Sequence, residues 1–504
     1  MRRLVRNLIA AGVFAMAISA APAGGVTSKL RTVITTDMES DDLASLLRYL
    51  LYSNEFDTQG LIYTTSRFHW AGDGEGTKFF LPGREYETPQ TDWRWTGTRY
   101  IQDLVLPAYA KVYSNLRRHD PSYPTPEELL SIVKIGNIIF EGEMNSDTEG
   151  SNLIRSLLLD EDPRPLYLQA WGGTSTIGRA LKSIEKENKC SGHWHELKAA
   201  ISRKAIIMGS GFQDGVYADY IAPHWPDLQF RDLSRGYSPW SYHCRGGAPF
   251  SLPKDQVYFN GEWIKANIQK GPLGSLYRSW LDGQAMPEDP LDVFGIPELA
   301  DGPDVWCRPL NQYDFLSEGD NVCFNPLINT GLDDPADPTV GGWGGRLIQS
   351  QTVPSLWTLP VSEKLSNGTA VEDLSTIRWI EAAQNDFAAR MQWTLTGEYS
   401  EGNHPPLVKI KGHKLVEARP GSTVVLKSTT SDPDKNKVST SWWQYLEEGT
   451  FPDFVKVEKH GEDQAKVAVP VDAKTGQTIS IVLQGTDDGR HPLTRYDRVS
   501  IQVT

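Results

Sequence analysis

The sequence has few cysteines, no excess of positive charge and no long apolar run beyond its N-terminus. Its four cysteines are widely spaced and include no C-x-x-C pair, which excludes a zinc ribbon and leaves one or two disulfides open in an oxidising compartment. The spacing does not determine their connectivity, and Cys307 with Cys323 is the pair that we would test first. The formal net charge of −14 gives the chain no electrostatic reason to bind nucleic acid or an anionic membrane.

The start of the chain has the features of a secretory signal peptide. Several arginines precede an apolar stretch from Leu8 to Ala20, and the small residues Ala21-Pro22-Ala23 follow it as a cleavage site. Residues 1–23 are therefore predicted to be removed, and the protein is predicted to be secreted, extracellular or periplasmic. The alternative is a short membrane anchor, but the apolar stretch is too short for a good transmembrane span.

Four acidic residues lie between a predicted strand and a predicted helix. The strand covers Thr32–Thr36, and leucines at helical spacing predict a helix that begins near residue 40. Between them stand Asp37, Glu39, Asp41 and Asp42. Carboxylates this close repel one another unless a cation lies among them, and calcium prefers oxygen ligands. Alternatively, the last two acids only cap the helix, which would leave the first two unexplained.

The first four-fifths of the chain alternate between apolar strands and amphipathic helices. Further strands are predicted at 60–66, 165–170 and 204–209, helices at 97–115, 125–133 and 151–159, and a last helix at 376–393. This alternation is typical of a doubly wound α/β domain with a mostly parallel sheet. In such sheets the ligand site lies at the carboxyl ends of the strands, where the acidic loop is predicted to be.

The last hundred residues have a different pattern. A polar, proline-containing linker at 397–406 is followed from Leu407 by strands with a period of two residues. Residues 404–504 are therefore predicted to form a small all-β, Ig-like sandwich. Because its strands hold no cluster of titratable groups, we expect this domain to be separable and not catalytic.

The acidic loop resembles that of nucleoside hydrolases. Those enzymes open with a strand, the motif D-x-D-x-x-x-D-D and a helix, whereas this chain has T-x-D-x-x-x-D-D with Thr35 in place of the first Asp. The segments TTDMESDD, RYLLYSNEFDTQGLIYTTS and WIKANIQKGPLGSLY are similar to a secreted offshoot, the cellulose-binding, nucleoside-hydrolase-like proteins with an Ig-like C-terminal domain. The resemblance implies a nucleoside-hydrolase-like domain at residues 26–396.

The resemblance also implies a calcium site. Its ligands would be Asp37, Asp41 and Asp42, together with the backbone carbonyl of Ser175 and the side chain of Asp320. Ser175 stands in WGGTST, where the family has G-P-L-T-N, and Asp320 follows a Glu-Gly pair late in the domain.

The same resemblance implies roles in catalysis. Asp37 would take a proton from the attacking water, and the general acid would be Glu39 or Glu318, since Glu318-Gly319 replaces the histidine that often precedes the family's last Asp.

Four further residues are predicted to bind substrate. Arg67 follows the second strand where nucleoside hydrolases place an Asn against ribose, which speaks against a nucleoside substrate. Trp171 precedes the Gly-Gly pair of WGGTST, and Trp343 and Arg346 stand in a glycine-rich loop. For these last two residues a purely structural turn is an equal alternative.

Three functions follow from these patterns. The first is a secreted, calcium-dependent glycoside hydrolase in which water attacks the anomeric carbon of polysaccharide-derived glycosides and inverts it. The second is a non-catalytic carbohydrate-binding or cellulose-binding protein on the same fold. The third is a secreted nucleoside N-ribohydrolase. The sequence leaves the sugar, its linkage and homo-oligomerisation open.

Overall fold

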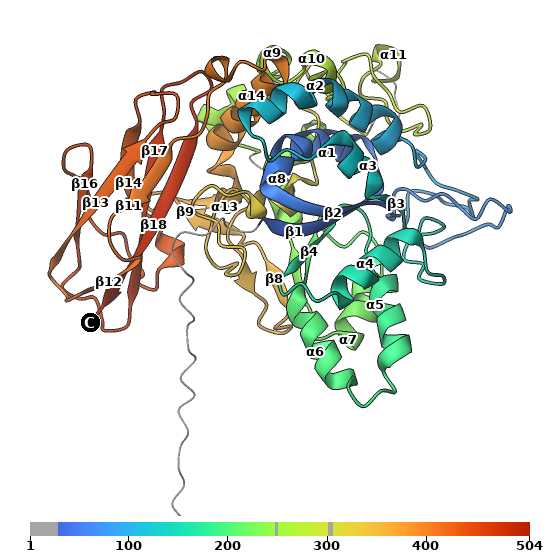
Figure 1. The fold of residues 1–504 in the computed structure, drawn as a ribbon, viewed down its shortest axis with the longest axis horizontal. Coiled ribbons are helices and arrows are strands. Elements are labelled where there is room, and N and C mark those ends of the chain that lie inside the picture. Colours follow the sequence, from blue (N-terminus) through green and yellow to red (C-terminus); the bar gives the residue numbers. More distant parts are fainter. Residues whose placement is uncertain (1–28, 247–249, 301–305) are drawn as a thin grey trace, which may run out of the picture.

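An eight-stranded, mostly parallel sheet forms the centre of the larger part of the molecule (Figure 1). The structure is a computed structural model that describes residues 29–246, 250–300 and 306–504, so the predicted signal peptide lies outside the described residues. The strand order is β3-β2-β1-β4-β5-β6-β8-β7, and only β7 runs antiparallel to its neighbour. The strands are β1 Leu30–Thr36, β2 Phe56–Tyr63, β3 Val133–Ile135, β4 Leu166–Ala170, β5 Ala205–Gly209, β6 Gln229–Asp232, β7 Ile348–Gln349 and β8 Leu356–Thr358.

The order of the strands reverses direction beside β1. This strand pairs in parallel with β2 on one side and with β4 on the other, so the chain winds outward in opposite directions from the β1/β4 boundary. In open α/β sheets such a switch point leaves a crevice at the carboxyl ends of the strands, where ligands bind. The acidic loop follows β1 directly and therefore lies at this position.

Helices cover both faces of the sheet (Figure 1). Ile34 packs in an apolar cluster with one set of helices, whereas its neighbour Val33 packs with the other set, because successive side chains of a strand point to opposite faces. The first set is α1 Ser40–Tyr52, α2 Leu106–His119 and α14 Ile380–Leu395, and the second is α4 Glu149–Leu159, α5 Ser175–Asn188 and α6 Trp194–Lys204. The predicted doubly wound α/β fold is confirmed.

Short helices fill the connections. They are α3 Pro126–Ser131, α7 Ala222–His224, α8 Tyr237–Trp240, α9 Gly261–Asn267, α10 Gly271–Gly274, α11 Pro297–Ala300, α12 Asn321–Phe324 and α13 Leu374–Ile377, with a hairpin of β9 Ser362–Lys364 and β10 Ala370–Glu372. None of the helices in the described residues is long and apolar enough to cross a membrane.

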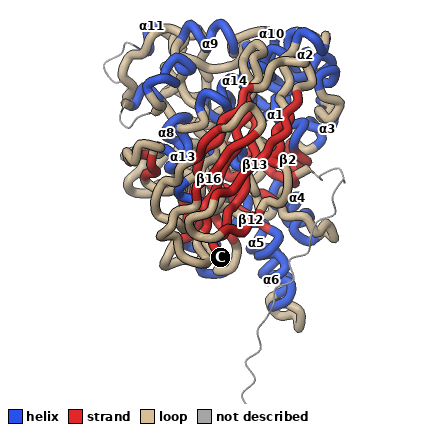
Figure 2. The backbone as a smooth tube through the Cα atoms, turned by 90° about the vertical axis from the view of Figure 1, so that its left-hand side faces the viewer, coloured by secondary structure: helices blue, strands red, loops and turns tan. Residues whose placement is uncertain are grey.

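The C-terminal strands form two four-stranded sheets that pack on each other (Figure 2). One sheet has the order β11-β13-β16-β15 and the other β12-β18-β17-β14. Buried and exposed side chains alternate along the strands, as in β13, where Val424, Leu426 and Ser428 are buried and the residues beside them are exposed. The strands are β11 Leu407–Ile410, β12 Leu415–Ala418, β13 Thr423–Ser431, β14 Ser439–Gln444, β15 Val457–Lys459, β16 Gln464–Ala468, β17 Thr478–Thr486 and β18 Thr494–Val503. The predicted all-β sandwich is confirmed.

The sandwich shares an apolar core with the α/β part. Tyr445 and Tyr496 of the sandwich belong to the same buried cluster as Trp343 and Trp379. The ring centroids of Trp379 and Tyr496 are 5.5 Å apart. This packing differs from the expectation of a separable domain, because the sequence shows the linker but not which aromatic side chains meet across it.

The disulfide joins Cys244 to Cys307, with 4.8 Å between their Cα atoms. The pairing of Cys307 with Cys323 that we would have tested first is wrong. The thiol of Cys323 is buried below the sheet's carboxyl edge and points at the carbonyl oxygen of Met208, 3.2 Å away. Cys190 is a free, exposed thiol.

Candidate functional site

The acidic loop turns sharply between β1 and α1. Met38 has a φ of 54°, in the left-handed region that residues other than glycine rarely adopt. Two hydrogen bonds hold it there: its N–H donates to Thr36 Oγ1, and its carbonyl accepts from Thr96 Oγ1, both at 3.0 Å. Such strain is common at functional sites, because the surrounding structure must hold it. The turn places Asp37 and Glu39 on either side of a buried methionine.

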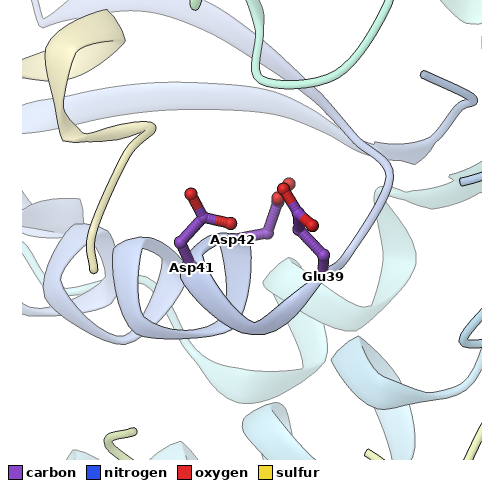
Figure 3. Close-up of side chains that lie close together, drawn as sticks. All are labelled: Glu39, Asp41 and Asp42. Atoms are coloured by element: carbon purple, nitrogen blue, oxygen red, sulfur yellow. The ribbon is translucent and has the colours of Figure 1, made fainter. Parts of the chain in front are cut away.

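Three acids of the loop and the first helical turn lie close together. Glu39 is the N-cap residue of α1, and Asp41 and Asp42 follow in its first turn. Figure 3 shows their carboxylates gathered on one side of the helix. Each offers an oxygen that lies within 4.8 Å of those of the other two, a separation that one metal ion can bridge.

Asp37 is buried and its carboxylate has no hydrogen-bond partner among the described residues. Leaving a buried charged group unpaired is costly, so this carboxylate needs a partner that the described chain does not supply. The turn after β4 makes room for it, because a Cβ atom at Gly172 would come within 2.8 Å of Asp37 Oδ1. The Gly-Gly pair therefore allows the two loops to approach.

Asp320 joins the acids from a distant part of the chain. It precedes α12, and its N–H donates to Ser45 Oγ of α1 over 3.2 Å. A Cβ atom at the preceding Gly319 would lie 2.5 Å from Asp41 Oδ2, so the Glu-Gly-Asp turn needs glycine at this position. We call Asp37, Glu39, Asp41, Asp42 and Asp320 the acid cluster.

Burial and mutual repulsion shift the pKa values of the cluster. Burial, followed by the neighbouring carboxylates, raises the pKa of Asp41 and of Asp42 well above the usual range of aspartate. Burial also raises the pKa of Asp320 in this way, with Asp37 and Glu39 adding to the effect. For Asp37 burial is the main cause and the pKa rises to about 6. The cluster thus holds more negative charge than this buried position favours without a cation.

Glu39 is the exception, because neighbouring cationic groups lower its pKa. Its Oε2 lies 2.6 Å from Nε2 of the buried His69, whose Nδ1 lies 2.7 Å from the carbonyl oxygen of Arg94. Burial alone would raise the pKa of Glu39, but His69 and the guanidinium of Arg94 lower it to about 2. The sequence analysis missed both partners. The one available signal is that His69 follows a strand next to β1.

A cavity of 690 Å³ opens above the acid cluster. Glu39, Asp41 and Asp320 reach it, and so does Arg67, whose role in substrate binding stays a prediction. Aromatic side chains surround it: Phe212 is 43% and Trp306 38% exposed, although both are large apolar residues. The other lining residues are Phe68, Glu85, Arg94, Ser210, Gly211, Gln213, Tyr237, Ser241, Tyr242, Arg245 and Leu291. Exposed aromatic rings beside polar groups are typical of carbohydrate-binding surfaces.

Two predicted site residues lie in the core instead of the cavity. Glu318 is fully buried in an ion pair with Arg48, so it does not face the cavity as a general acid would. Trp171 is also fully buried, and its indole N–H donates to Gln169 over 3.1 Å. The glycines and acids beside these two residues in the sequence suggested that their side chains reach a ligand. In the structure, partners on α1, α12 or β4 enclose both side chains.

The glycine-rich loop packs against the sandwich. Trp343 is buried, with the guanidinium of Arg495 over its ring at 5.8 Å. Arg346 is paired with the buried Glu363 at 3.0 Å. Neither residue lines the cavity at the acid cluster, so their predicted role in substrate binding is corrected to a structural one. The alternative of a structural turn describes this loop.

Ser175 begins α5 and lies behind the turn after β4. Its Oγ is 3.2 Å from Thr64 Oγ1 and 3.3 Å from Thr65 Oγ1, and these contacts tie α5 to the end of β2. The predicted role of its carbonyl oxygen as a calcium ligand stays a prediction.

The residues of the acid cluster fit a hard divalent cation. The donor set consists of carboxylate oxygens, which calcium prefers. The unpartnered oxygens of Asp37 and the close approach of Glu39, Asp41 and Asp42 are the observations that support the fit. Asp37, Asp41, Asp42 and Asp320 are the residues that would hold the ion.

Comparisons with known proteins agree with this architecture. The profile of a family described as "Cellulose-binding Sde182, nucleoside hydrolase-like domain" matches residues 31–347, and that of "Cellulose-binding protein Sde0182, C-terminal domain" matches residues 423–503. A solved structure of a nucleoside hydrolase-related hypothetical protein from Saccharophagus degradans, associated with carbohydrate metabolism, is 27% identical. It covers 95% of this chain and 100% of its own, with a TM-score of 0.67.

Two other solved structures are dissimilar in overall shape. Human CDH23 EC21-23 is 18% identical over 20% of this chain and 33% of its own, with a TM-score of 0.15. The endo-fucoidan hydrolase MfFcnA9 from glycoside hydrolase family 107 is 10% identical over 94% of this chain and 80% of its own, with a TM-score of 0.17. Neither supports an argument about this protein. No curated protein matches the sequence.

Proposed function

The chain belongs to the cellulose-binding, nucleoside hydrolase-like family, and from this premise we propose that it is a secreted, calcium-dependent glycoside hydrolase. Its substrates would be glycosides derived from polysaccharides, bound in the 690 Å³ cavity above the acid cluster. The observation that carries the proposal is the buried carboxylate of Asp37, which has no partner among the described residues and lies beside Asp41, Asp42 and Asp320.

Asp37 and Glu39 have separate tasks in this proposal. A bound calcium ion would neutralise the cluster and lower the pKa of a bound water molecule. The carboxylate of Asp37 accepts the proton of the attacking water. Glu39, fixed by His69 and open to the cavity, accepts hydrogen bonds from sugar hydroxyl groups. In a single displacement, the water oxygen bonds to the anomeric carbon and inverts it, the glycosidic bond breaks, and the departing oxygen takes a proton from solvent.

The cavity favours sugar rings of a polysaccharide over a nucleoside. Arg67 follows β2, where the nucleoside hydrolases that this chain resembles have an Asn against ribose. Phe212 and Trp306 provide apolar ring surfaces at the cavity. Such surfaces pack against the C–H faces of pyranose rings, which supports a carbohydrate ligand.

One observation favours the alternative of a carbohydrate-binding protein without catalysis. Both carboxyl groups that were predicted as general acids are engaged elsewhere, Glu318 by Arg48 and Glu39 by His69. Without a proton donor, a leaving group of low acidity departs slowly. On this reading the cavity binds the sugar and does not cleave it.

The Asp37→Asn variant separates the two functions. It keeps the shape of the side chain but removes the base, so hydrolysis of glycosides should fall on the order of 10²–10⁴-fold at saturating calcium. Release of reducing sugar across a panel of glycans, and isothermal titration with the same glycans, would be measured for the variant and the wild type. The control is Asp472→Asn, a change at an exposed residue of the sandwich. Sugar binding without hydrolysis by the wild type would establish the binding function.

A further inference from the structure

Two arginines at the cavity have no carboxylate partner among the residues that the structure describes. Arg67 donates one hydrogen bond, from Nη2 to the carbonyl oxygen of Gly83 over 3.2 Å, and Arg245 is exposed. Neither forms an ion pair with any residue that the structure describes. Arg94, in the same lining, is different, because Asp289 binds its guanidinium through two hydrogen bonds of 2.9 Å.

The acids of the cavity do not compensate these two charges. Glu39 is paired with His69, and Glu85 accepts a hydrogen bond of 3.1 Å from Arg94. The remaining acids at the cavity, Asp41 and Asp320, belong to the acid cluster, where we place a cation. Among the described residues that line the cavity, these two guanidinium groups are therefore the positive charges without an ion-pair partner.

Aromatic rings hold both arginines at the cavity. The guanidinium carbon of Arg245 lies 4.7 Å from the ring centroid of Trp306 and 5.4 Å from that of Tyr242. The guanidinium carbon of Arg67 lies 5.4 Å from the ring centroid of Phe68. These cation–π contacts restrain the side chains but leave most of their N–H groups free for a ligand. A sugar ring that packs beside Trp306 brings its substituents within reach of Arg245.

We propose that the cavity selects a sugar with an anionic substituent, a uronic acid carboxylate or a sulfate ester. Arg67 and Arg245 are the specificity-determining residues, because the planar guanidinium forms paired hydrogen bonds with two oxygens of such a group. The inference rests on the proposed function in one respect: the carbohydrate must bind in this cavity. It goes beyond that function, because the cellulose of the family's description is a neutral glucan and would leave both charges unmatched.

Three matched sugars test the charge preference. They are methyl β-D-glucoside, methyl β-D-glucuronide and methyl β-D-glucoside 6-sulfate, which differ only at carbon 6. Their dissociation constants would be measured by NMR titration of the full chain at one saturating calcium concentration. We expect the wild type to bind one or both anionic sugars at least about tenfold more tightly than the neutral one, as expected for a charge-assisted pair. The carboxylate and sulfate arms identify which group the cavity accepts.

Substitutions locate the effect. Arg67→Gln and Arg245→Gln should each weaken binding of the preferred anionic sugar about tenfold and leave the neutral sugar unchanged. Arg419→Gln, an exposed position on the sandwich, changes the net charge by the same amount and should keep the preference.

The outcomes separate this inference from the proposed function. The charge preference is overturned if the wild type binds the neutral and both anionic sugars equally well. It is also overturned if Arg419→Gln loses as much affinity for the anionic sugar as the two cavity variants do. In both cases carbohydrate binding stands. Failure of all three sugars to bind overturns both.

Discussion

Arg48 and Glu318 form an ion pair that is completely enclosed by the protein. Arg48 Nε lies 2.5 Å from Glu318 Oε2, and Nη2 lies 3.1 Å from Oε1. Tyr277 and Asn321 donate further hydrogen bonds to the same carboxylate. Because α1 carries Arg48 together with Asp41 and Asp42 of the cluster, this pair fixes α1 against the loop that brings Asp320 to the site.

We predict that Glu318→Gln destabilises the protein and weakens its affinity for calcium, because the loop of Asp320 is then no longer fixed against α1. The substitution leaves the guanidinium of Arg48 buried and uncompensated, which typically costs about 3–5 kcal/mol. Urea unfolding measures the loss, and isothermal titration measures calcium binding. The control Glu381→Gln removes an exposed partner of Lys254 and should cost less than about 1 kcal/mol. Lower hydrolysis at unchanged stability would instead show that Glu318 takes part in catalysis.

The sequence was sufficient to predict those parts of the site whose residues lie close together in the chain. The acids from Asp37 to Asp42 lie close together in the chain and follow an apolar strand, so both their proximity and their place at the sheet edge could be predicted. His69 and Arg94 could not, because they come from an irregular excursion after β2 without periodicity. Trp343 was misassigned because burial at the contact between two folded parts depends on tertiary packing and not on local pattern.

The Asp37→Asn variant should be more stable than the wild type when calcium is chelated. Burial raises the pKa of Asp37 from 3.8 in the unfolded chain to about 6, so the folded state loses stability as the pH rises through this interval. At neutral pH the ionised carboxylate costs up to about 3 kcal/mol, and asparagine removes that cost. Thermal melts in chelator and in calcium measure it. The wild type should gain stability on adding calcium and the variant should gain less; a less stable variant in chelator would contradict the prediction.

His243 should make the protein less stable in weak acid. Burial is the main cause that lowers its pKa from 6.5 to about 4, and its Nε2 lies 3.0 Å from the carbonyl oxygen of Pro239. The unfolded chain therefore takes up a proton at a higher pH than the folded chain, and stability is lost as the pH falls from 6.5 to about 4. Urea unfolding across this range should show a loss of about 3 kcal/mol that His243→Gln removes. His413→Gln, at an exposed position, should leave the profile unchanged.

The cysteines should react with a thiol reagent in three steps. In the native protein a thiol reagent should modify Cys190, which is exposed, and spare Cys323, which is buried. Unfolding without reductant should make Cys323 accessible to the reagent. Reduction should then free the thiols of Cys244 and Cys307 for labelling. Mass spectrometry of the labelled peptides reads each step. Labelling of Cys307 before reduction would show that the disulfide had not formed.

Removal of the sandwich should destabilise the α/β part. A chain that ends near residue 402 exposes the buried rings of Trp343 and Trp379, and it leaves Asp386 without Arg495, now 2.8 Å away. Loss of this apolar contact favours aggregation. Size-exclusion chromatography and thermal melts of the truncated chain would show the effect.

A protease site at the exposed residues 398–401 supplies the matched control for that truncation. It cuts the same linker but keeps both parts in solution. If the shared core holds them together, the cleaved halves should elute as one species and keep the melting temperature of the intact chain to within a few degrees. Halves that separate, with an α/β part that stays monomeric and binds calcium as before, would show that each part folds alone and that the aromatic contact contributes little.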